Sequence, residues 1–113
     1  MKIIIAGGRD FIPSESAEKY LFSMLTTLKP DVVVSGGCRG ADRFGETMAK
    51  RLNIPVKVFN ADWSEGKSAG PRRNGRMALY ADCLILFPGG RGTSDMRKQA
   101  MIHGLKIYEW MEA

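Results

Sequence analysis

Three glycine-rich turns in the sequence each contain an arginine, a combination of residue types suited to holding an anion. They span residues 7–10, 36–42 and 88–93. Glycine lets backbone N–H groups approach a ligand without a Cβ in the way, and arginine adds positive charge. One glycine pair alone is explained as easily by the needs of a tight turn, whereas three arginine-bearing turns favour phosphate binding. The residues of these turns expected to contact a ligand are Gly7, Gly8, Arg9, Gly36, Gly37, Arg39, Gly40, Gly89, Gly90, Gly92 and Thr93.

A fourth polar cluster, Gly70–Asn74, opens a predicted helix. Arg73 can pair with phosphate through two parallel hydrogen bonds, and Asn74 can recognise a sugar or a base edge. Cations at a helix N-terminus oppose the helix dipole, so an anion is expected to offset them. Asp42 and Asp95 lie early in two other predicted helices. Each either caps its helix, or binds ribose hydroxyls or acts as an acid or base.

The polar segment Asn60–Gly70 is long for a connection between a strand and a helix, and it reads either as a functional loop or as a disordered surface loop. Trp63 in this segment either stacks on a purine or pins the loop to the core. Lys67 is a candidate phosphate contact on a closing lid. The only histidine, His103, is expected to be a structural or surface residue, and no spacing of ligand residues indicates a metal site.

The turns follow short apolar runs that alternate with amphipathic segments. The predicted strands are Lys2–Ala6, Asp31–Ser35, Ile54–Phe59, Cys83–Phe87 and a weaker Leu105–Trp110. The first predicted helix runs from near Ser14 to near Lys29. The other three span Ala41–Leu52, Pro71–Tyr80 and Thr93–His103. This order predicts an α/β sandwich in which a mainly parallel sheet of about five strands has helices on both faces. The turns would then share the carboxyl edge of the sheet, where ligands bind in such folds.

Length and composition indicate a single globular domain over residues 1–113, with 44% hydrophobic and 26% charged residues. No apolar run suits a membrane span or a signal peptide, so a cytoplasmic protein is expected. The net charge of +5 favours an anionic partner, either nucleic acid or a small phosphorylated ligand. No stripe of aromatic and basic residues favours nucleic acid. Cys38 and Cys83 are expected to be ordinary reduced thiols.

Four segments of the chain, in order, resemble the SLOG superfamily. They are Gly7–Asp10, Ser35–Asp42, Gly70–Met77 and Phe87–Met96. This group includes DprA/Smf proteins, LOG nucleotide hydrolases and YspA/YpsA-related proteins, and the chain is most similar to the small YspA-type members found in bacteria and phages. The resemblance implies a Rossmann-like three-layer sandwich. It also implies a sensor or processing domain that binds a nucleotide or nucleotide-derived ligand.

The resemblance to LOG enzymes also implies a possible reaction, hydrolysis of the N-glycosidic bond of a nucleoside monophosphate. Arg73 matches the catalytic arginine of that group by its spacing to Met77, whereas Asn74 replaces a lysine. The position of the catalytic glutamate is Met96, which cannot carry a proton. Asp95 stands one residue earlier, which turns its carboxylate by about 100° around a helix. If the protein is an enzyme, Arg73 and Asp95 are the candidate catalytic residues.

Three functions therefore remain open. The leading hypothesis is a binding domain for a nucleotide or nucleotide-derived ligand, with no other cofactor and no metal expected. The alternative is a hydrolase that cleaves the N-glycosidic bond of a nucleoside monophosphate or an ADP-ribose-like nucleotide. Net charge alone suggests the third, a nucleic-acid binder. The sequence leaves a homodimer open and identifies no face that would form it.

Overall fold

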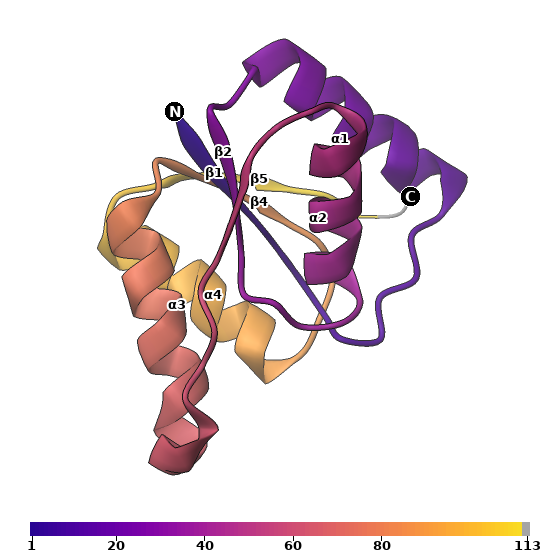
Figure 1. Ribbon diagram of the computed structural model, residues 1–113. Coiled ribbons are helices and arrows are strands. Elements are labelled where there is room, and N and C mark those ends of the chain that lie inside the picture. The colour runs from indigo at the N-terminus through magenta and orange to yellow at the C-terminus, as the bar shows by residue number, and fades with distance from the viewer. Residues whose placement is uncertain (112–113) are drawn as a thin grey trace.

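The computed structural model describes residues 1–111 and shows a parallel sheet between two layers of helices (Figure 1). The strands are β1 (Lys2–Ala6), β2 (Val32–Ser35), β3 (Val56–Val58), β4 (Cys83–Leu86) and β5 (Lys106–Glu109). The helices are α1 (Glu15–Leu28), α2 (Ala41–Arg51), α3 (Ala69–Tyr80) and α4 (Arg91–Ile102). The strand order is β3-β2-β1-β4-β5, and every pairing is parallel. The predicted Rossmann-like three-layer sandwich is confirmed.

The central strand β1 contributes to both hydrophobic layers. Ile3 and Ile5 face the layer that contains α1 and α2, whereas Ile4 and Ala6 face the layer that contains α3 and α4. Side chains alternate between the two faces of a strand, so a strand covered on both sides must be apolar at consecutive positions. This requirement explains why the run Ile3–Ile5 is fully buried.

Helix ends follow local chemistry that the sequence shows. The Ser14 hydroxyl accepts a hydrogen bond from the Ala17 amide at 3.1 Å and caps α1. Lys29 ends that helix in a left-handed conformation at φ 48°, directly before Pro30. Asn53, just beyond α2, also has a positive φ of 58°, which asparagine tolerates better than most residues.

Two helix starts and one loop differ from the sequence-based prediction. Helix α3 begins at Ala69 and not at Pro71, and α4 begins at Arg91 and not at Thr93. Most of the predicted loop Asn60–Gly70 is also helical, because Trp63–Ser68 forms a 3-10 segment (η1) with a kink at Gly66. The Asp62 carboxylate accepts a hydrogen bond from the Ser64 amide and caps this segment, a signal that the sequence contained.

The chain order places the end of β1 beside the end of β4. The chain starts in the middle of the sheet, extends outward through β2 and β3, and then crosses to the other side of β1 to form β4. Strand order therefore reverses between β1 and β4. Ligands of open parallel sheets bind in the crevice beyond the carboxyl ends of the strands at such a reversal.

Candidate functional site

A cavity of about 270 Å³ lies at this reversal point. The start of α2, the middle of α3 and the start of α4 surround it. Its lining comprises Ala6, Gly7, Gly8, Arg9, Cys38, Asp42, Arg73, Asn74, Met77, Gly90, Arg91, Gly92, Thr93 and Met96. Nine of the sequence-predicted site residues are among them: Gly7, Gly8, Arg9, Asp42, Arg73, Asn74, Gly90, Gly92 and Thr93.

The glycine turns meet because their backbones touch. The Gly8 amide donates a hydrogen bond to the Pro88 carbonyl at 2.9 Å, and a Cβ on Gly8 would lie only 2.9 Å from the Gly89 Cα. Gly40 adopts a φ of 76° and packs against the Gly8 carbonyl, which accepts the Ala41 amide at 3.1 Å. Such contacts leave no room for side chains. Glycines 8, 40 and 89 are therefore required by the packing of the turns, whether or not a ligand binds.

Two amides expected to be free for phosphate are already engaged. The Gly8 amide binds Pro88, and the Gly37 amide donates to the Ser35 hydroxyl at 3.1 Å. The expectation that these two N–H groups cradle a ligand is wrong, because each has a partner inside the protein. Gly36 serves the site differently. A Cβ there would lie 2.8 Å from the Arg73 Nη1 atom, so glycine at this position makes room for the arginine.

The glycines at the start of α4 behave differently. A Cβ added to Gly90 or Gly92 would meet no protein atom within 4 Å, although both residues line the cavity. Gly90 precedes the first turn of α4, and no side chain among residues 1–111 caps that turn. A helix N-terminus has amides without intrahelical partners and a partial positive charge, which together favour an anion. Arg91, in the same turn, lines the cavity as well.

Arg73 is buried in the middle of the site. It is the fifth residue of α3, and its Nη1 atom donates to the Gly36 carbonyl at 2.6 Å. Its Nε atom donates to the Asn74 Oδ1 atom at 3.0 Å. The neighbouring Arg72 points elsewhere and pairs with Glu65 at 2.6 Å. Glu65 therefore offsets the charge of Arg72, whereas the hydrogen-bond acceptors of Arg73 are neutral oxygens.

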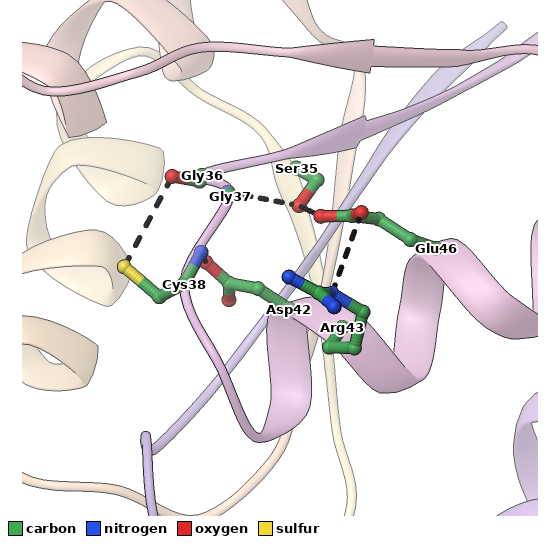
Figure 2. Close-up of polar contacts among 7 residues, drawn as sticks. All are labelled: Ser35, Gly36, Gly37, Cys38, Asp42, Arg43 and Glu46. Carbon is green, nitrogen blue, oxygen red and sulfur yellow. Dashed lines mark hydrogen bonds and ion pairs between the residues drawn. The ribbon is translucent and has the colours of Figure 1, made fainter.

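Asp42 is a buried carboxylate in the cavity wall. Its Oδ2 atom accepts a hydrogen bond from the Cys38 amide at 3.2 Å (Figure 2). Burial raises the pKa of Asp42 from 3.8 to about 6, although the Cys38 amide and the charge of Arg73 both lower it. Helix α2 has no side-chain cap, so the capping role considered for Asp42 is wrong. A carboxyl group that titrates near neutral pH suits acid or base chemistry and hydrogen bonding to hydroxyl groups.

A buried network supports the turn after β2. The Ser35 hydroxyl donates to the Glu46 Oε2 atom at 2.6 Å and accepts the Gly37 amide (Figure 2). The Glu46 side chain is 13% exposed, and Arg43 lies 3.8 Å from its other oxygen. This network ties the turn to α2, so it holds the Gly36 carbonyl that receives Arg73.

Three predicted residues with polar or aromatic side chains lie outside the cavity lining. Arg39 pairs with Asp10 at 3.0 Å, and both side chains are largely exposed. Trp63 is 56% exposed, so it does not pin its segment to the core. Its ring lies 5.5 Å from the Arg9 guanidinium, which does line the cavity. Lys67 is exposed on η1.

The carboxylate of Asp95 also lies outside the cavity lining, whereas Met96 lines the cavity and is almost fully buried. Asp95 accepts a hydrogen bond from the Asn74 Nδ2 atom at 2.9 Å and does not cap α4. Sequence reasoning missed five of the lining residues: Ala6, Cys38, Met77, Arg91 and Met96. The two methionines have the spacing of ordinary core residues, and only the tertiary arrangement shows that each also forms part of the cavity wall.

Comparison with known families gives one match. The family model described as YspA, cpYpsA-related SLOG family (YAcAr) matches residues 1–66. The chain belongs to this SLOG family. The match covers the first two glycine turns and Asp42, whereas Arg73 and the start of α4 lie beyond the SLOG match. No curated protein matches the chain significantly.

Metal ligands and thiols bear on the chemistry of the SLOG site. Among residues 1–111, no group of three or more His, Cys, Asp or Glu residues is arranged to hold a metal ion. Both cysteines are free thiols, and Cys38 lines the cavity.

No helix in the described part of the chain has the length and apolar character needed to cross a membrane.

Proposed function

We propose that the cavity binds a nucleotide or nucleotide-derived ligand through a phosphate group. The observation that carries this proposal is the convergence of an uncapped helix start with three arginines, Arg9, Arg73 and Arg91, around one cavity. Among residues 1–111, Asp42 is the only carboxylate that lines the cavity. The lining is therefore positively charged whichever form Asp42 takes, and a phosphate dianion would neutralise it when Asp42 is ionised.

The phosphate would lie at the start of α4. The open faces of Gly90 and Gly92 allow it to approach the backbone amides, and Arg73, on the neighbouring helix α3, lines the same cavity. Helix N-termini and guanidinium groups are both frequent phosphate partners in proteins. The glycines here have no packing partner that requires them, which supports a ligand as the reason for their small size.

The sugar and base would occupy the rest of the cavity and its mouth. Asp42 is placed to accept hydrogen bonds from ribose hydroxyls, as carboxylates do in other nucleotide sites. At about 270 Å³ the cavity is near the lower end of ordinary ligand sites, about 300–1,000 Å³, so the base would extend past Arg9. The exposed ring of Trp63, which Arg9 already contacts, would offer a stacking surface there.

Titration calorimetry with a panel of nucleoside mono- and diphosphates tests this function. We expect one or more to bind, and Arg9→Ala and Arg73→Ala each to weaken binding about tenfold to a hundredfold, the usual effect of removing a charged hydrogen bond. Arg51→Ala is the matched control, because Arg51 is exposed at the far end of α2. Arg9 is exposed, so its variant avoids the folding defect that Arg73→Ala risks. A folded protein that binds no nucleotide would refute the proposal.

A second candidate function is hydrolysis of the N-glycosidic bond of the bound nucleotide. The position of Asp42 favours it, because this buried carboxyl has a pKa near 6 and lines the cavity together with Arg73. A carboxylate close to the sugar stabilises the oxocarbenium-like transition state of such reactions. The test is whether free base is released from AMP, measured by chromatography. Release that Asp42→Asn abolishes and the exposed control Glu15→Gln retains would support hydrolysis. No release by the wild-type protein would leave binding alone.

A further inference from the structure

The side chain of Asn74 is committed to the protein, although it lines the cavity. Its Nδ2 group donates to the Asp95 Oδ2 atom at 2.9 Å and to the Gly92 carbonyl at 3.3 Å. Its Oδ1 atom accepts the Nε–H of Arg73 at 3.0 Å. A side-chain amide has two N–H donors, and both are used here. Asn74 is therefore poorly placed to recognise a sugar or a base.

Asp95, together with the Gly92 carbonyl, determines which way this amide points. An ionised carboxylate only accepts hydrogen bonds, so it requires the Nδ2 group of Asn74 on its side. The Oδ1 atom must then face Arg73, where an acceptor is needed. A flipped amide would place donor against donor at Arg73 and acceptor against acceptor at Asp95. The carboxylate is thus the closer of two acceptors that orient the amide, and the amide in turn orients the arginine.

The guanidinium of Arg73 is held at two points and open at the third. Nη1 is bound by the Gly36 carbonyl and Nε by Asn74. Among residues 1–111, the structure shows no hydrogen bond from Nη2. Every buried side-chain nitrogen or oxygen in this part of the chain has a hydrogen-bond partner, so an atom without a partner is accessible. Nη2 therefore retains access to the open space of the cavity that Arg73 lines.

We propose that Asn74 and Asp95 are positioning residues that act through Arg73, holding its guanidinium so that Nη2 faces the bound anion while neither residue contacts the ligand. This inference rests on the proposed function for the identity of the anion. The hydrogen bond from Asn74 to the Gly92 carbonyl also ties Arg73 to the start of α4. The two sides of the phosphate site are thereby held in one arrangement before a ligand arrives.

Two variants of Asp95 separate positioning from direct action. Asp95→Asn keeps an oxygen that can accept the Asn74 Nδ2 group, whereas Asp95→Ala removes the closer of its two acceptors and leaves only the Gly92 carbonyl at 3.3 Å to orient the amide. Both variants remove the same negative charge, so any difference between them reports orientation and not charge. Ser94→Ala, at an exposed neighbouring position on α4, is the control. Thermal melts followed by circular dichroism verify that each variant folds.

The first readout needs no ligand. The charge of Arg73 lowers the pKa of Asp42, which also faces the Cys38 amide, Glu46 and Arg9. Titration of the Asp42 carboxyl followed by carbon NMR should therefore give a higher pKa in Asp95→Ala than in Asp95→Asn, because Arg73 moves away only in the first. Equal pKa values for the two variants would overturn the positioning role.

The second readout is the affinity for AMP, measured by calorimetry. We expect Asp95→Asn to bind within about threefold of the wild-type protein and Asp95→Ala to bind about tenfold more weakly, the loss typical of a misplaced charged hydrogen bond. Equal losses in both variants would mean that the Asp95 charge acts on the ligand itself, which contradicts the proposal. If the NMR difference is found but the wild-type protein binds no nucleotide, the positioning stands and the proposed function fails.

Discussion

Replacing Asp42 by asparagine should stabilise the ligand-free protein at neutral pH. The folded protein buries this carboxylate, and burial raises its pKa from 3.8 to about 6. Between these two values the folded state keeps a proton that the unfolded state has lost. Stability therefore falls as the pH rises through this window, and the full cost remains above it. Asparagine has no charge to bury and keeps an oxygen that can accept the Cys38 amide.

The size of the effect follows from the two pKa values. A difference of one pH unit corresponds to about 1.4 kcal/mol, so the change from 3.8 to about 6 amounts to about 3 kcal/mol at pH 7. A typical domain is stable by only about 5–15 kcal/mol, so this is a large fraction of the total. Well below pH 3.8 the carboxyl group is protonated in both states, and the stability of the variant should then approach that of the wild-type protein.

Urea denaturation from pH 3.5 to 7.5 measures the difference between variant and wild-type protein, which removes the contribution of other titrating groups. Asp31→Asn is an informative control. The hydrogen bond from the N-terminal ammonium group lowers the pKa of Asp31, so this variant should lose stability at pH 7 and match the wild-type protein at low pH. An Asp42→Asn variant that is less stable than the wild-type protein at pH 7 would refute the reasoning about burial.

Three further substitutions test how the site is built. Gly92→Ala should leave the free energy of unfolding unchanged or raise it by up to about 1 kcal/mol, because its Cβ meets no protein atom. Calorimetry should show weaker nucleotide binding by this variant, and unaltered binding would place the phosphate elsewhere. Gly45→Ala should destabilise the protein by about 1–3 kcal/mol in urea denaturation, because its Cβ would lie 2.6 Å from the Ile5 Cγ2 atom; an unchanged midpoint would contradict the packing of α2 on β1. Arg39→Ala should change nucleotide affinity by less than about fivefold, since its exposed pair with Asp10 lies outside the cavity, and a larger loss would return Arg39 to the site.

The fold could be predicted from the sequence because its signals are local and repeated. Consecutive apolar residues such as Ile3–Ile5 indicate a strand that is covered on both faces, and the segments between such runs have one apolar face. The sequence pattern places the start of α3 two residues too late, because Gly70 and Pro71 are typical of a break in a helix. In the structure proline occupies the first turn of α3, where its missing N–H costs no hydrogen bond.

The role of Arg73 depends on the difference of two residues between the predicted and the observed start of α3. With a helix start at Pro71, Arg73 would lie in the first turn, beside exposed amides. With the start at Ala69, it is the fifth residue of α3, beyond the first turn, where it is buried and binds the Gly36 carbonyl. The glycines likewise look alike in the sequence, yet Gly8 and Gly89 pack against each other while Gly90 and Gly92 face open space. Only the contacts between distant segments separate these roles.

A crystal structure of the protein with bound nucleotide tests the central claim most directly. Crystals grown or soaked with the nucleotide that binds best in solution should show its phosphate between the start of α4 and the Nη2 atom of Arg73, within hydrogen-bonding distance of the Gly92 or Thr93 amide. A nucleotide held elsewhere, such as the groove between α1 and α2, would contradict the account. So would a cavity that stays empty at concentrations that saturate binding in solution.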